Sequence, residues 1–124
     1  MKKYGLLALL LFIGAVSACA QVFDFTLVHK TGYTIDQVFV SPSDDEEWGD
    51  DVLGDDVLEN SDSWDITFDP DYEEIMLEYG VDLYDLKVVY EDESEDYWRD
   101  LKLETIYEIT LKLDRQGNGV ATFK

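Results

Sequence analysis

The sequence is short of basic residues, cysteine and histidine, and each shortage removes a class of function. Nine lysines and arginines stand against 29 aspartates and glutamates in 124 residues, a formal net charge of −20. The single cysteine cannot form a disulfide within the chain. The single histidine, His29, leaves multi-histidine zinc sites and serine-histidine-acid triads without their parts. We expect His29 to be an exposed turn residue or one hydrogen-bonded to backbone.

The placement of the basic residues excludes a nucleic-acid interface. No lysine or arginine lies between Lys30 and Lys87, whereas binding a phosphate backbone needs clustered positive charge. The acidic residues have two interpretations. They are the solvated surface of a soluble monomer, or they form a face that binds a cation, a basic protein or a neutral glycan.

The N-terminus has the pattern of a bacterial export signal. Lys2 and Lys3 precede an apolar run over residues 6–16, which is too short for a permanent transmembrane helix of about 20 residues. Residues 1–20 are therefore predicted to be a signal peptide, and the protein is expected to work outside the cytoplasm. Loss of both lysines with the signal leaves seven basic residues against 29 acidic ones, a formal charge of −22.

The end of the signal allows two cleavages. Residues 18–20 form an A-x-A site that would release a soluble protein beginning at Gln21. Residues 16–19 equally resemble a lipobox, in which Cys19 is acylated and becomes the first residue. The lone cysteine at this position favours lipidation, although strand-like residues begin at Val22 and leave no flexible tether. Membrane contact is expected only through this lipid.

Residues 21–124 are predicted to form a single β-rich domain. The chain has 46% apolar and 14% aromatic residues, well above the disordered range despite its charge. Turn residues predict a first hairpin at Gly32, a second at residues 91–96 and a third at residues 114–119. Period-two alternation predicts strands at residues 23–28, 33–40, 63–68, 83–90, 97–103, 107–113 and 120–123.

One helix is expected among these strands. Asp69 is a suitable N-cap, Pro70 fits the first helical position, and Gly80 fits a C-terminal cap. Apolar residues between them recur at helical spacing, which predicts a short amphipathic helix over residues 70–79, with a strand over residues 75–79 as the alternative. The expected fold is therefore all-β or mainly β: an antiparallel β-sandwich or partly open barrel of about seven strands with one short inserted helix.

Several short motifs are spaced along the mature chain. They are Thr31-Gly32-Tyr33, Ser41-Pro42-Ser43, Trp48-Gly49, residues 84–92, Trp98 and Thr110-Leu111. Together they resemble a group of small exported bacterial proteins of unknown function. The chain departs from that group at His29, where asparagine is expected, at residues 103–104, where members often carry cysteine, and at the helix-like insertion. The resemblance implies export and a small β-rich domain, and it brings no established activity.

The densest acidic stretch is a candidate cation site. A hard cation such as calcium is bound by clustered carboxylates with carbonyls from glycine-containing loops, and the segment 44–56 offers both, although its spacing matches no defined motif. Calcium is the one cofactor indicated, and a calcium-binding module is the alternative function. The eight candidate ligands are Asp44, Asp45, Glu46, Glu47, Asp50, Asp51, Asp55 and Asp56.

The leading hypothesis is a non-catalytic, monomeric module that binds a protein or glycan partner through this acidic loop face. Trp48, flanked by acids and Gly49, is the candidate partner-binding residue, and anchoring of the loop is the other role open to it. Trp64 is in phase with apolar neighbours and is expected in the core. A carboxylate-dependent hydrolase is the third hypothesis, but no pair of carboxylates is singled out.

Overall fold

The computed structural model describes residues 22–124. The signal peptide, the lipobox cysteine Cys19 and the A-x-A site before Gln21 lie outside the described residues. No helix within residues 22–124 is long and apolar enough to cross a membrane. The elements, in chain order, are β1 (Phe25–His29), β2 (Ile35–Pro42), β3 (Ser63–Ile66), α1 (Pro70–Glu78), β4 (Tyr84–Tyr90), β5 (Glu95–Leu101), the 3-10 helix η2 (Leu103–Thr105), β6 (Glu108–Leu113) and β7 (Gly119–Phe123).

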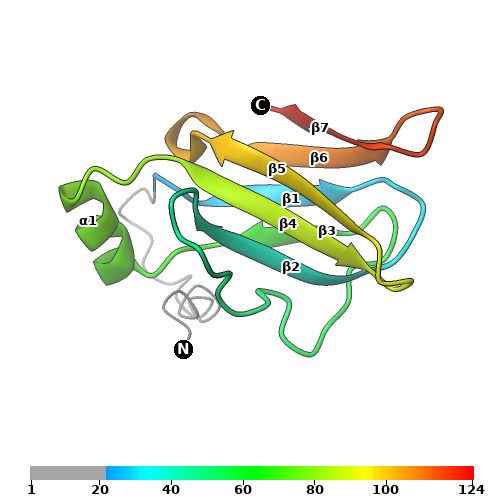
Figure 1. The fold of residues 1–124 in the computed structure, drawn as a ribbon, viewed down its shortest axis with the longest axis horizontal. Coiled ribbons are helices and arrows are strands. Elements are labelled where there is room, and N and C mark those ends of the chain that lie inside the picture. Colours follow the sequence, from blue (N-terminus) through cyan, green and yellow to red (C-terminus); the bar gives the residue numbers. More distant parts are fainter. Residues whose placement is uncertain (1–21) are drawn as a thin grey trace.

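The strands form two sheets that pack face to face (Figure 1). The larger sheet has the order β3-β1-β6-β7, and the smaller has the order β2-β4-β5. Leu27 and Ile109 of the larger sheet and Val38 and Val88 of the smaller are each 0% exposed, because they fill the space between the sheets. The mainly-β class is confirmed, and because neither sheet closes on itself there is no closed barrel and the arrangement is that of a β-sandwich.

The first predicted hairpin is wrong, because β1 and β2 lie in different sheets. β1 pairs with β3 in antiparallel fashion and with β6 in parallel fashion, so one pair departs from the expected antiparallel pattern. β2 pairs with β4 instead. Alternation gives each strand one apolar face, but it does not say whether two such strands pair side by side or pack face to face.

The connection from β1 to β2 is an arch that closes around His29. This side chain is 0% exposed, and its Nε2 lies within hydrogen-bonding distance of the carbonyl oxygen of Tyr33. Burial lowers the pKa of His29. Gly32 adopts a φ of 91°, in the left-handed region, and donates its N–H to Asn60 Oδ1 at 2.8 Å. Of the two roles expected for His29, the structure has the backbone-bonded one.

The other two hairpins and the helix are confirmed. β4 pairs with β5 and β6 with β7, both antiparallel. The carboxylate of Asp114 accepts the N–H groups of Gln116 and Asn118, each at 2.9 Å, which fixes the last turn. Asp69 caps α1 by accepting the N–H of Asp71 at 2.8 Å. These elements were predictable because their signals are local.

The core extends to the start of the described chain. Phe23 is 0% exposed, and its ring centroid lies 5.5 Å from that of Phe68 and 5.0 Å from that of Tyr84. Trp64 is half-buried and packs against the same core, as its phase predicted. The segment just before β1 is therefore part of the packed domain.

Candidate binding site

The smaller sheet has an outer face, turned away from the larger sheet, that carries a row of large side chains. Strand register places Phe39 of β2 opposite Lys87 of β4, and Lys87 opposite Tyr97 of β5. Their sequence neighbours on these strands, such as Val38 and Val88, point into the core, so alternation sends this row outward. The row forms a platform of two rings with a lysine between them.

Trp48 of the acidic loop, which we define as residues 43–62 between β2 and β3, packs on this platform. Its ring centroid lies 6.3 Å from that of Phe39 and 6.2 Å from that of Tyr97. Lys87 Nζ lies 5.2 Å from the Trp48 ring centroid and 4.8 Å from that of Phe39, within the range of cation–π attraction. Trp48 is half-buried, so it anchors the loop while part of its surface stays exposed.

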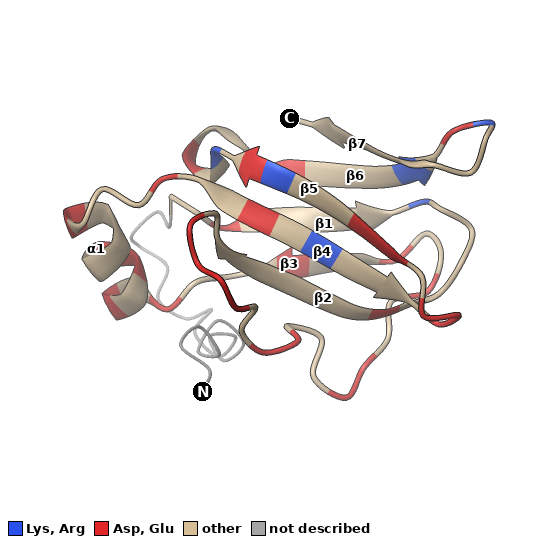
Figure 2. Cartoon of the chain, in the orientation of Figure 1, with Lys and Arg blue, Asp and Glu red and all other residues tan. Residues whose placement is uncertain are grey.

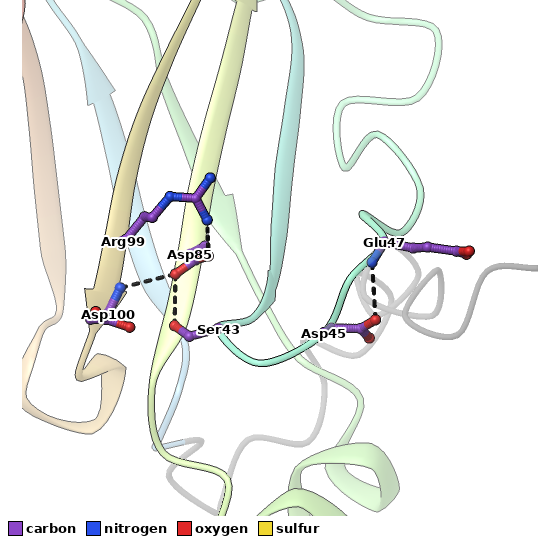
Figure 3. Close-up of polar contacts among 6 residues, drawn as sticks. All are labelled: Ser43, Asp45, Glu47, Asp85, Arg99 and Asp100. Atoms are coloured by element: carbon purple, nitrogen blue, oxygen red, sulfur yellow. Dashed lines mark hydrogen bonds and ion pairs between the residues drawn. The ribbon is translucent and has the colours of Figure 1, made fainter.

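Next to the platform, Asp85 of β4 is a buried carboxylate with several donors (Figure 3). Ser43 donates its hydroxyl to Oδ1 at 2.7 Å, and the N–H of Asp100 donates to the same oxygen at 2.9 Å. Arg99 pairs with Oδ2 at 2.8 Å. Asp100 reaches this position because β5 shifts register here and its φ is 56°.

A pocket of about 350 Å³ lies between the acidic loop and the outer face. Trp48 and Arg99 line it together with carboxylates, and because Arg99 pairs with Asp85 the loop carboxylates Glu46 and Glu47 give it negative charge. Figure 2 shows the same loop as a run of acidic residues beside the smaller sheet. The lining residues are Ser41, Pro42, Asp45, Glu46, Glu47, Trp48, Asp85 and Arg99.

The eight predicted calcium ligands lie in three different environments. Asp45, Glu46 and Glu47 line the pocket. Asp51 turns inward, where its Oδ1 accepts the N–H of Val38 at 2.9 Å and that of Leu53 at 3.0 Å, and burial raises its pKa. Within residues 22–124, no three aspartate, glutamate, histidine or cysteine side chains converge as a metal site. The remaining four, all exposed, are Asp44, Asp50, Asp55 and Asp56.

Two further carboxylates, the half-buried Asp24 and the buried Glu73, hold the segment before β1 to the residues around α1. Glu73 is 6% exposed, and its Oε2 accepts the N–H of Phe23 at 2.8 Å. Asp24 Oδ1 accepts the N–H of Phe68 at 2.9 Å. Burial raises the pKa of Glu73, and burial with the nearby charges of Glu73 and Asp65 raises the pKa of Asp24 to about 6.

Sequence reasoning missed Asp85, Arg99 and the Asp24–Glu73 pair. In the alternating pattern of their strands, Asp85 and Arg99 look like ordinary outward-facing residues. Glu73 lies in the first turn of the helix, where an acidic residue is expected because it complements the helix dipole. One signal was present: Glu73 falls next to Tyr72 on the inner side of α1, where a charged residue needs a partner. No local signal indicated that this partner would be the backbone N–H of Phe23.

Comparison with known proteins bears on the fold alone. No family model matches the chain, and no curated protein matches it. The solved structures include a similar one, described as the NMR structure of the protein from Eubacterium rectale. It has a TM-score of 0.54 and 14% sequence identity, with 88% of this chain and 94% of that one covered. At this identity the likeness concerns the fold alone.

Proposed function

We propose that this protein is an exported, lipid-anchored or soluble, non-catalytic binding module whose ligand enters the pocket beside Trp48. The observation that carries the proposal is the pocket itself, which joins a half-exposed tryptophan to polar and charged groups on one face. Binding sites commonly combine an aromatic wall with a few placed polar groups. The partner is a protein or a glycan outside the cytoplasm.

The scaffold around the pocket supports this proposal, because part of the wall is held in place by the protein's own contacts. Asp85 is held by three donors, and Trp48 by two rings and a lysine. Ser41 is buried on the pocket side of β2. A preformed site loses little conformational entropy when a ligand binds.

Export and lipidation are tested by the intact mass of the protein from its native host. A diacyl or triacyl increment on a chain that begins at Cys19 is the expected result. An unmodified chain that begins at Gln21 would support export and contradict lipidation. A chain that retains residues 1–20 would contradict both.

The pocket is tested by binding to a panel of glycans and short peptides, with the wild type compared with Trp48→Ala. As a matched control, Tyr107→Ala removes an aromatic ring that is 67% exposed and lies outside the pocket. We expect a panel member that both the wild type and the control bind, and that Trp48→Ala binds at least about tenfold more weakly. Equal binding by both variants, or no binding by any panel member, would overturn the proposal.

A further inference from the structure

The charge of the pocket limits what can enter it. Asp45, Glu46 and Glu47 lie on the loop side, and Asp85 lies on the sheet side with Arg99 as its ion-pair partner. Among residues 22–124, no ion pair includes Glu46 or Glu47. Glu46 and Glu47 would repel an anionic ligand at close range, so the pocket favours a cation or a neutral group.

The aromatic platform favours a cationic group over a neutral one. Phe39, Trp48 and Tyr97 already surround one cation, because Lys87 Nζ lies 4.8 to 6.0 Å from their centroids. Arg99 places a second cation 5.3 Å from the Tyr97 ring centroid. Two cations of the protein therefore lie against this ring cluster, which shows that its geometry suits positive groups. Trp48 belongs both to this ring cluster and to the wall of the pocket.

We propose that the ligand group is the cationic side chain of a basic peptide, seated between Trp48 and the carboxylates Glu46 and Glu47. This inference rests on the proposed function and names the chemistry of its ligand. A guanidinium group would contact the aromatic wall and donate hydrogen bonds to the two carboxylates. The Arg99–Asp85 pair would form the opposite side of the pocket, and Arg99 would repel a second cation there.

The probe is an acetylated and amidated pentapeptide, Gly-Ser-Arg-Ser-Gly, compared with the same peptide that carries citrulline in place of arginine. Citrulline keeps the shape and lacks the charge. Binding is followed by the shift of the Trp48 indole N–H signal in an NMR titration of residues 21–124, assigned with Trp48→Phe. We expect saturable binding of the arginine peptide and at least about tenfold weaker binding of the citrulline peptide.

Two double variants separate the pocket from the general acidity of the protein. Glu46→Gln with Glu47→Gln changes the pocket, whereas Asp55→Asn with Asp56→Asn makes the same charge change at exposed positions of the same loop outside the pocket. We expect the first to weaken arginine-peptide binding at least fivefold and the second less than twofold.

Each contrary outcome overturns the inference in a distinct way. Equal binding of the two peptides would show that charge is not recognised. Equal losses in the two double variants would show attraction to the whole surface and not to the pocket. A glycan that binds at Trp48 when neither peptide does would overturn the basic-peptide ligand and leave the proposed function standing.

Discussion

Asp85 and Glu73 are both buried carboxylates, but their surroundings differ in kind. Asp85, on the outer face of the smaller sheet, has the guanidinium of Arg99, the hydroxyl of Ser43 and a backbone N–H. Glu73, on α1, accepts the backbone N–H groups of Phe23 and Val22 and lies near the carboxyl group of Asp24. No ion pair within residues 22–124 includes either Asp24 or Glu73.

This difference shows what burial does to a charge with and without an opposite partner. At the α1 end, desolvation raises the pKa of both carboxyl groups, and the nearby charges of Glu73 and Asp65 raise that of Asp24 further, so the fold favours their protonated forms. At the pocket, a cation and two neutral donors surround the carboxylate, and a ligand meets groups already fixed in place. We therefore propose the pocket as the recognition site, and we expect the stability of the α1 end to be the more sensitive to pH.

The largest expected effect is the loss of Asp85. Asp85→Ala would leave the Asp100 N–H and the Ser43 hydroxyl without their acceptor, which should lower the free energy of unfolding by about 2 to 3 kcal/mol. Urea denaturation measures it. The control Asp55→Ala, at an exposed position, should change stability by less than about 0.5 kcal/mol. A loss below about 1 kcal/mol for Asp85→Ala would contradict the assignment of these hydrogen bonds.

The next effect is a pH dependence at the α1 end. The pKa of Asp24 is about 6 in the fold, above that of the unfolded chain near about 4, so protonation stabilises the fold. This contribution is fully present below about pH 4 and is lost as pH rises through about 6. Urea denaturation should give about 1 kcal/mol more stability at pH 5 than at pH 7.5. Asp24→Asn should reduce this difference, and an unchanged difference would contradict the role of Asp24.

A smaller effect is expected when the charge of Glu73 is removed. Glu73→Gln keeps an oxygen acceptor for the Phe23 N–H and abolishes the unfavourable buried charge, so stability at pH 7.5 should stay level or rise by less than about 1 kcal/mol. Asp85→Asn, compared in the same thermal and urea experiments, should destabilise the fold because Arg99 loses its ion-pair partner. Equal losses in the two variants would remove the distinction between the two sites.

The smallest effect is expected from calcium, which remains the alternative function. Millimolar calcium should raise the melting temperature no more than the same concentration of magnesium, because the predicted ligands are divided among the pocket wall, the interior and exposed positions. A calcium-specific rise, together with calcium in the purified protein, would make the acidic loop a calcium site.

Prediction succeeded where the signal was local. The Asp69 cap of α1 and the Asp114 turn between β6 and β7 depend on residues within four positions of each other. The Arg99–Asp85 pair joins residues 14 apart, and the Phe23–Glu73 bond joins residues 50 apart, so neither has a local signature. Composition singled out the acidic loop as the candidate region, but its division into pocket-lining, inward and exposed carboxylates was not predictable.

The sequence by itself determined the β-rich class, the helix at residues 70–78, two of the three hairpins and the negative charge, because alternation, capping and turn chemistry act over a few residues. Only the tertiary structure decided that β1 and β2 lie in opposite sheets, that β1 runs parallel to β6, and that Trp48 meets Lys87 beside a pocket. These features depend on which apolar faces pack together, and many pairings of the same faces satisfy the same local pattern.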